Sequence, residues 1–514
     1  MTRGESVNTA AKVRGLKLRD DDNVVVVLDP APAGAPIAGY DLIASQATPP
    51  GHKIAARDIA QGEAIRKYGQ IIGFAKVAIA KGAHVHVANV ELLEFDRNSE
   101  FGSRAPLTRY VDAPATFMGY RRDDGRAGTR NYIGIVTTVN CSATVARYIA
   151  DTFRGDRLAD YPAVDGVVAL THGSGCCMGA DEDGMKQLNR TLAGFARHPN
   201  FAGVIIAGLG CETNQIATIL DDHDLHGRAS IRTLGIQESG GTRKTVEAGV
   251  AMVEEFLQGE RSRRREPVPA SELMVGLECG GSDGYSGISA NPALGRAADL
   301  LVANGGTAIL SETPEIYGAE HLLTDRADSP AVAQKLMQLI RWWEDYTQKN
   351  GSKMDNNPSP GNKDGGLTTI LEKSLGAVAK GGSTRLMDVY RYAETITSRG
   401  FVFMDSPGYD PASITGQMAS GANLICFTTG RGSVFGSKPA PCIKIATNSS
   451  LYQRMSEDMD VNAGRIIDGS ASVDEVGQEI FKLMLRVASG EETRSEALGF
   501  GDHEFTPWVF GAQM

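Results

Sequence analysis

Four cysteines follow short apolar runs that are typical of buried β-strands, each at the point where its strand is expected to end. They are Cys141, Cys176, Cys211 and Cys279, and three of them stand beside a glycine, which lets backbone approach a ligand closely. In open α/β sheets, ligands bind beyond the carboxyl ends of the strands. Thiols gathered there can hold a soft metal or act as nucleophiles. The alternative, that each cysteine is a small packed hydrophobe, weakens when four share this position, so the pattern predicts an enzyme.

Three histidines offer a second kind of metal ligand. His84 and His86 stand at i and i+2 in an alternating segment, 84–88, so a strand would point both imidazoles to the same face. His52, with Lys53 after it in a turn, adds a third imidazole and a cation for a carboxylate. A solvated strand face is the competing interpretation of the histidine pair.

Several glycine-rich loops combine polar groups with room for a substrate. Segments 171–176 and 208–212 bring His172 and Glu212 beside two of the cysteines. Segment 276–284 carries a thiol, carboxylates and Ser282 with Asp283, and glycine turns of this kind bind anions through their N–H groups.

The loop 357–366 is the most unusual string, because two prolines fix it and Asn362 with Lys363 presents donors to an oxyanion. Thr429 and Arg431 end another apolar run, and the guanidinium is suited to clamp a carboxylate. Structural turns or rigid solvent loops are the competing interpretations of these segments.

The composition limits the class of protein. A chain of 514 residues with 42% hydrophobic residues implies more than one domain. The net charge of −10 argues against nucleic acid as a partner, and the absence of a long apolar run argues against a membrane span. Seven cysteines, an odd number, do not form a disulfide framework. We therefore expect a cytoplasmic enzyme with a small-molecule ligand, and symmetry favours a homodimer.

The pattern of apolar runs divides the chain. Residues 1–15 are expected to be disordered, 16–92 to form a small β-rich module and 93–118 a linker. From 119 onward, apolar runs alternate with helical stretches, which favours parallel strands with crossover helices. The prediction is an α/β protein with catalytic blocks at 119–259 and 270–514, separated by an arginine-rich linker.

These strings, in this order, resemble the altronate dehydratase family, which also includes galactarate dehydratases and sulfolactate sulfo-lyases. The resemblance rests on Gly51-His-Lys, His84-Val-His, Gly208-Leu-Gly-Cys-Glu, Glu278-Cys-Gly-Gly-Ser-Asp-Gly, Asn357-Pro-Ser-Pro-Gly-Asn-Lys and Thr429-Gly-Arg-Gly. It implies that residues 16–92 are a SAF module and that the enzyme removes water from a sugar acid, a hexonate such as D-altronate, to give a 2-keto-3-deoxy acid. A divalent metal is implied, with Fe²⁺ preferred and Mn²⁺ as the alternative.

Two metal arrangements are open for such a reaction. Cys141, Cys176 and Cys211 permit an iron–sulfur cluster with one open iron, whereas His52, His84 and His86 suit a mononuclear Fe²⁺, which we favour. The candidate catalytic residues are His172, Lys363, Glu212 and Asp283. The candidate substrate ligands are Asn362, Arg431, Ser282, Thr429, His52 and Lys53.

Lys363 has two possible roles. As the base facing the α-carbon it must lose its proton, and as a carboxylate anchor it must keep it; we favour the anchor. The functional alternatives are a galactarate dehydratase, a sulfolactate sulfo-lyase-like C–S lyase, and a sugar-acid-binding relative without catalysis. A thiol-redox role is the weakest, because no C-x-x-C is present.

Overall fold

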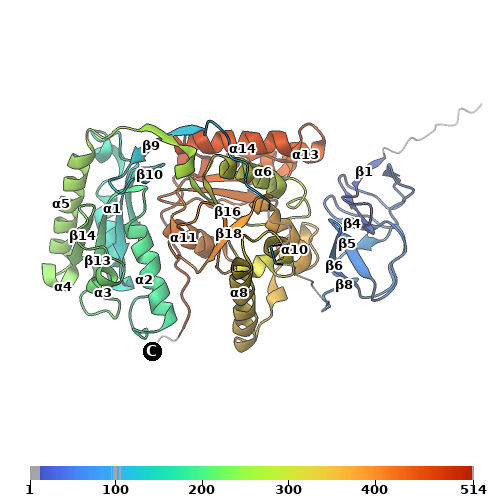
Figure 1. Ribbon diagram of the computed structural model, residues 1–514, viewed down its shortest axis with the longest axis horizontal. Helices are drawn as coiled ribbons and strands as arrows, with labels where there is room; N and C mark the ends of the chain where they lie inside the picture. The colour runs from blue at the N-terminus through green and yellow to red at the C-terminus, as the bar shows by residue number, and fades with distance from the viewer. Residues whose placement is uncertain (1–11, 94, 96–100, 103–105, 512–514) are drawn as a thin grey trace, which may run out of the picture.

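The computed structural model describes residues 12–93, 95, 101–102 and 106–511, which form three folded units (Figure 1). The N-terminal unit lies at one end of the molecule, the first α/β block at the other end, and the second α/β block between them. Residues 1–11 of the expected disordered start lie outside the described residues, and the first strand already begins at Val13. No helix in the described ranges is long and apolar enough to span a bilayer.

The N-terminal unit is the expected small β-rich module. Its centre is Val24–Val27, a continuous apolar run whose side chains are all buried. A five-stranded sheet has the order β3-β1-β2-β4-β7, and a three-stranded sheet has the order β5-β6-β8. The strands are β1 (Val13–Leu16), β2 (Val24–Val27), β3 (Ile37–Ala38), β4 (Lys53–Ala55), β5 (Ala64–Lys67), β6 (Gln70–Ala75), β7 (His84–Val85) and β8 (Val90–Glu91).

The first α/β block contains a parallel sheet of order β12-β11-β13-β14. The first three of these strands are largely apolar because helices cover both faces, whereas the edge strand β14 carries the exposed residues Arg232 and Thr233. Helices α1 and α5 share a core with one face, and α2 packs between the other face and α11 of the next block. The elements are β11 (Tyr132–Thr137), β12 (Gly166–Leu170), β13 (Phe201–Gly208), β14 (Ile231–Gly235), α1 (Ala143–Asp151), α2 (Asp183–Ala196), α3 (Ile216–Asp222), α4 (Ile236–Ser239) and α5 (Thr242–Glu260).

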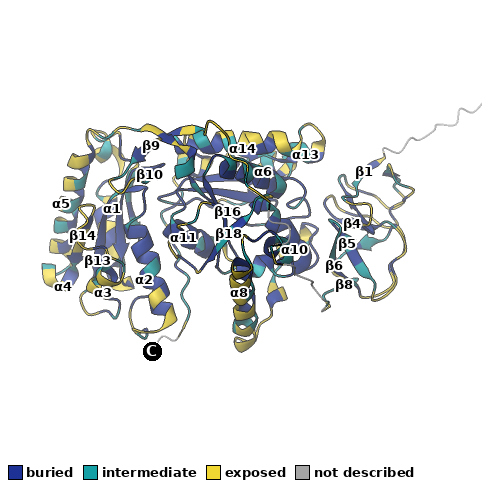
Figure 2. Cartoon of the chain, in the orientation of Figure 1, coloured by how far each residue is buried: buried dark blue, intermediate teal, exposed yellow. Residues whose placement is uncertain are grey.

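The second α/β block is built on a seven-stranded parallel sheet of order β18-β19-β17-β16-β20-β21-β22. Its strands are almost wholly buried (Figure 2). They are β16 (Met274–Cys279), β17 (Thr307–Leu310), β18 (Leu386–Tyr390), β19 (Gly400–Met404), β20 (Leu424–Thr429), β21 (Cys442–Ala446) and β22 (Val461–Asn462).

Helices α6 and α14 pack on one face of this sheet, and α11 packs on the other. A small sheet of β9 (Thr116–Arg121), β10 (Ala127–Gly128) and β15 (Glu266–Pro269) joins the two blocks. The helices of the second block are α6 (Ala290–Ala303), α7 (His321–Thr324), α8 (Pro330–Lys349), α9 (Pro360–Asp364), α10 (Ile370–Val378), α11 (Asp410–Ser420), α12 (Ser449–Arg454), α13 (Gly464–Asp468), α14 (Val473–Ala488) and α15 (Arg494–Ala497). The predicted class, a β-rich module before two mainly parallel α/β blocks, is confirmed.

A buried ion triad fastens the N-terminal module to the second block. The Nζ atoms of Lys53 and Lys67 each lie 2.9 Å from the Glu372 carboxylate on α10, and all three side chains are shielded from water. Lys53 also donates to the Gly366 carbonyl at 2.6 Å. Burial alone would raise the pKa of Glu372, but the two ammonium groups hold it far below its usual range. The ammonium of Lys53, which we expected at the substrate, instead attaches the module to the core.

Replacing Glu372 with glutamine should therefore destabilise the module's attachment strongly. It leaves two buried ammonium groups without a counter-charge, which typically costs about 3–5 kcal/mol. Chemical unfolding should show this loss, and limited proteolysis should release the module. The exposed pair Arg296–Asp474 supplies the control, since Asp474→Asn should cost no more than about 1 kcal/mol. Because the folded-state pKa of Glu372 lies below its unfolded value, the wild-type contribution is present at neutral pH and lost as the solution becomes acidic. Equal stability of Glu372→Gln and Asp474→Asn would contradict this account.

Candidate active site

The N-terminal module covers the carboxyl edge of the seven-stranded sheet. Loops after β16, β20 and β21 end there, and the module's turn at Gly51 is pressed against them: a Cβ atom at Gly284 would lie 2.0 Å from the Gly51 carbonyl oxygen. Tyr285 donates from its hydroxyl to the Leu28 carbonyl at 3.1 Å. The module thus docks on the strand-end loops of its own chain. The predicted residues gathered here are His52, His84, His86, Ser282, Asp283, Asn362, Lys363, Thr429 and Arg431.

The three histidines form a compact group with their ligand atoms within 4.8 Å of one another. His52 Nδ1 lies 3.0 Å from His84 Nε2, and His52 Nε2 lies 3.1 Å from the Asp364 carbonyl oxygen. That carbonyl can only accept, so it fixes the proton on Nε2 and leaves the Nδ1 lone pair facing the group. His86 Nδ1 is buried without a hydrogen-bond partner.

These imidazoles are held neutral. Burial lowers the pKa of both His84 and His86 to about 4, and the neighbouring imidazoles and Lys53 reinforce the shift. Neutral imidazole is the form that ligates metal. Three convergent ring nitrogens from neutral imidazoles fit a divalent transition metal such as Fe²⁺.

Two cations lie beside the histidines. Lys363, near the end of α9, is close enough to lower the pKa of His86. The Arg431 side chain lies against Gly365, where a Cβ atom would come within 3.2 Å of Arg431 Cδ. Within the described ranges neither cation has a carboxylate partner within 4.0 Å. The acidic chain thus concentrates unpaired positive charge where an anion could bind.

The loop 357–366 is rigid because its side chains hold its backbone. Ser359 and Asn362 form a reciprocal capping box at the start of α9, and Asn362 Nδ2 donates to the Ser282 carbonyl at 2.9 Å. The amide of Asn362 is therefore occupied in linking two loops. This favours a positioning role over the direct substrate contact that we expected.

The Asp283 carboxylate also holds neighbouring loops together through hydrogen bonds. Its Oδ1 accepts from Tyr285 N and Ser286 Oγ, each at 3.1 Å, and its Oδ2 accepts from Thr447 Oγ1 at 3.0 Å and Asn448 Nδ2 at 3.2 Å. Burial nevertheless raises its pKa. Thr429 Oγ1 accepts from Gly432 N at 3.1 Å and so shapes the turn that carries Arg431.

A buried acidic group behind this edge escaped the sequence analysis. Glu278, Glu312 and Asp410 offer carboxylate oxygens within 4.8 Å of one another, as do Cys279, Glu312 and Glu315. Lys380 Nζ lies 2.8 Å from Cys279 Sγ and 3.7 Å from Glu312, and Lys373 lies 2.5 Å from Glu315.

Burial raises the pKa of Asp410 to about 7, aided by Glu278 and Glu315, and burial raises that of Glu312 strongly. Asn357 Nδ2 donates to Glu315 at 2.8 Å, which links this group to the active-site loop. The only sequence signals were Glu278 and Glu312 at two strand ends, because Glu315 and Asp410 join them solely through tertiary packing.

Five of the remaining predicted residues lie at the four-stranded sheet: three cysteines, His172 and Glu212. Cys141, Cys176 and Cys211 are exposed at its carboxyl edge, whereas Cys279 is buried in the seven-stranded sheet. The four thiols therefore do not share one edge, contrary to expectation.

His172 and Glu212 lie beneath the three exposed thiols. His172 Nε2 lies 2.9 Å from the Thr137 carbonyl oxygen, its Nδ1 accepts from Ser174 N at 3.2 Å, and burial lowers its pKa to about 4. Glu212 accepts from Thr138 Oγ1 at 2.7 Å and from the Gly210 N–H at 2.6 Å. Both side chains brace their loops, and neither belongs to the group around Lys363.

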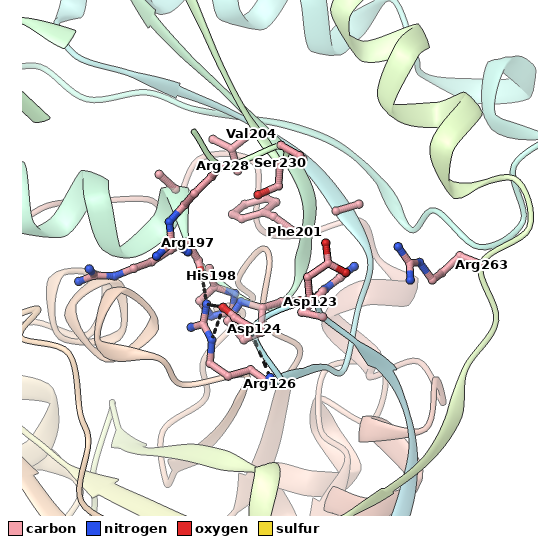
Figure 3. A pocket seen from close by; sticks show the side chains of 16 residues that line it. Asp123, Asp124, Arg126, Arg197, His198, Phe201, Val204, Arg228, Ser230 and Arg263 are labelled. Atoms are coloured by element: carbon pink, nitrogen blue, oxygen red, sulfur yellow. Dashed lines mark hydrogen bonds and ion pairs between the residues drawn. The ribbon is translucent and has the colours of Figure 1, made fainter. Parts of the chain in front are cut away.

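An arginine-lined cavity of about 200 Å³ opens at the opposite edge of the four-stranded sheet (Figure 3). Its guanidinium groups are largely engaged: Arg126 pairs with Asp124 at 2.6 Å, and Arg122 donates to the Pro199 carbonyl at 2.7 Å. It lies before β13 and β14, at the amino ends of strands, and none of the predicted site residues lines it. The histidine and lysine group under the module is therefore the candidate active site.

Comparison with known proteins agrees with this architecture. Residues 13–93 match the altronate/galactarate dehydratase SAF domain, 119–260 match the second domain of D-galactarate dehydratase/altronate hydrolase, and 270–513 match the C-terminal domain of D-galactarate/altronate dehydratase. The chain belongs to the galactarate/altronate dehydratase family. Dehydratases of this kind are hydro-lyases, and the chain is an enzyme of that class.

Individual relatives cover nearly the whole chain. An altronate dehydratase of Bacillus subtilis (strain 168) is 36% identical over 94% of this chain and 97% of its own length. A galactarate dehydratase (L-threo-forming) of Escherichia coli (strain K12) is 39% identical over 93% of each chain. A (2R)-sulfolactate sulfo-lyase subunit beta of Chromohalobacter salexigens is 34% identical over 76% of this chain and 97% of its own length.

Proposed function

We propose that this family member is a metal-dependent dehydratase that converts a hexonate such as D-altronate into a 2-keto-3-deoxy acid. The observation that carries the proposal is the placement of three neutral imidazoles beside two cations, Lys363 and Arg431, that lack carboxylate partners in the described chain. Candidate metal ligands and anion-binding groups thus lie in one region beneath the module. A hexonate presents a carboxylate and a row of hydroxyls, which matches both needs.

The chain's own residues would bind and orient the substrate. Lys363 is best placed to hold the carboxylate, and Arg431 the distal hydroxyls or a second carboxylate. Because the loop of Lys363 is capped and linked to Ser282, the ammonium is preorganised and needs little rearrangement when charge develops.

The metal would be held by His52, His84 and His86. When bound, it supplies Lewis-acid stabilisation of the enediolate formed on loss of the α-proton and assists departure of the β-hydroxide. The docked module, attached through Lys53 and Glu372, would shield the bound substrate from water. The proton is removed by a group facing the α-carbon, and Asp410, with its pKa raised to about 7, is a further candidate besides Lys363.

Galactarate and sulfolactate remain the competing substrates. Arg431 offers a second carboxylate clamp, which would serve a dicarboxylate such as galactarate. The relatives include enzymes named for each of the three substrates, so substrate choice depends on side-chain positions within the same site.

A substrate panel tests the proposal. The protein should be incubated anaerobically with Fe²⁺, a reductant and altronate, galactarate or sulfolactate in parallel, and the 2-keto acid product measured. We expect product from altronate and its loss on adding a chelator. Product from galactarate or sulfolactate alone would correct the substrate, and no product from a wider hexonate panel would favour a sugar-acid-binding protein.

A further inference from the structure

We propose that Cys141, Cys176 and Cys211 hold an iron–sulfur cluster at the carboxyl edge of the four-stranded sheet, separate from the histidine site. The three thiols extend from the loops after β11, β12 and β13, which are neighbours in the sheet. All three are exposed. The two metal arrangements that the sequence left as alternatives are thus two sites, on different sheets.

The three loops are bound into one frame by hydrogen bonds next to each cysteine. Asn140 N donates to the Ser174 carbonyl at 3.1 Å, and Asn214 N donates to the Gly175 carbonyl at 3.0 Å. Asn214 Nδ2 donates to the Thr138 carbonyl at 3.0 Å. Residues beside Cys141, Cys176 and Cys211 therefore touch one another, although up to 76 residues separate the hydrogen-bonded partners along the chain.

Buried polar residues support this frame from below. The side chains of His172 and Glu212 form hydrogen bonds with backbone and hydroxyl groups of the same loops. Such bracing is what a preorganised ligand set requires, because flexible loops would bind a cofactor weakly. It also explains why a buried His and a buried Glu lie at an edge without contacting a substrate.

The spacing of the thiols excludes a compact single-ion site of the kind that the histidines form. The ligand nitrogens of the three histidines lie within 4.8 Å of one another. The sulfur atoms of Cys141, Cys176 and Cys211 do not form such a compact group. A single tetrahedral ion needs its thiolates adjacent, since each lies about 2.3 Å from the metal. A cuboidal cluster instead places its thiolates on separate corners, farther apart. Three thiolates leave the fourth iron open to a small ligand.

Local electrostatics suit the anionic cluster. Cys141 lies two residues before α1 (Ala143–Asp151), whose first N–H groups favour negative charge. Gly175 and Gly210 adopt φ values of 101° and 127°, and their lack of side chains leaves backbone accessible at the edge. Thiolate binding requires only that each thiol lose its proton, and these thiols face solvent that can accept it.

Cys177 provides a matched control in the same loop. It is exposed, and its Sγ lies 4.0 Å from that of Cys176. Thiolates on two corners of a cuboid point away from each other, so a sulfur this close cannot take the adjacent corner. Substitution of Cys177 should therefore leave the cluster in place.

The test is spectroscopic and chemical, on the full chain purified anaerobically from iron-replete cells. We expect a brown protein containing about four irons and four acid-labile sulfides per chain. Cys141→Ser, Cys176→Ser and Cys211→Ser should each lose the visible absorption and the sulfide, whereas Cys177→Ser and His84→Ala retain them. Unchanged circular dichroism would show that the serine variants are folded.

Two results would overturn this inference. One is colourless wild-type protein that binds iron without sulfide, and the other is a folded Cys211→Ser variant with full sulfide content. Neither result bears on the histidine site, whose iron should persist in all the serine variants. Failure of the cluster and failure of the proposed dehydratase are thus distinguishable.

Discussion

His84→Ala should lower kcat/KM by at least about a hundred-fold and reduce the amount of iron bound at the histidine site. Even residues that only support metal ligands typically change affinity or activity 10–100-fold, and His84 is expected to be a ligand itself. Its Nε2 lies 3.0 Å from His52 Nδ1, so its removal opens one side of the group. Steady-state kinetics and metal analysis after anaerobic loading measure both effects.

The fold should survive this change, because His84 is only partly buried on a short strand and substitutions at such positions usually cost little stability. His226→Ala is the control: that imidazole is exposed beside Asp221 on the four-stranded block and should leave activity unchanged. Full activity of folded His84→Ala would mean that the histidines do not serve the reaction and that the module is a structural cover.

Lys363→Ala should produce the second large loss of kcat/KM. If the ammonium anchors the substrate carboxylate, this loss should appear mainly as a higher KM. An anchor acts in both the ground state and the transition state, so Lys363→Arg should keep measurable turnover with a raised KM. A base must lose its proton, and an arginine stays protonated, so in that role Lys363→Arg should abolish kcat while binding survives. We expect the first pattern.

Lys353→Ala is the matched control, since Lys353 is an exposed lysine before the same loop and should behave as wild type. If Lys363→Ala matched the Lys353→Ala control in both kcat and KM, neither role would hold. The loop 357–366 would then be a stiff structural element with no part in catalysis.

Much of the fold could be predicted from the sequence because local patterns determine it. Apolar runs alternating with helical stretches specify parallel strands and crossover helices, and the strand ends place Asp283 and Arg431 at a carboxyl edge. What local patterns do not specify is which edge belongs to which sheet. His172 and Glu212 follow strands just as Asp283 does, yet they lie on the four-stranded sheet.

The acidic group and the ion triad were missed for a related reason. Glu372 is one of two adjacent charged residues in the short, wholly buried helix α10, and its two lysine partners lie 319 and 305 residues earlier in the chain. Glu315 and Asp410 likewise meet Glu312 and Glu278 only when β16, β17 and α11 are packed together. Spacing along the sequence carries no signal for such contacts.

An iron-edge anomalous difference map most directly tests where catalysis occurs. Crystals of the anaerobically loaded enzyme should be soaked with a slowly reacting aldonate before data collection. We predict an iron peak among His52, His84 and His86, with the aldonate carboxylate directed at Lys363. A peak among Glu278, Glu312 and Asp410, with none at the histidines, would contradict the account and move the reaction to the buried acidic group.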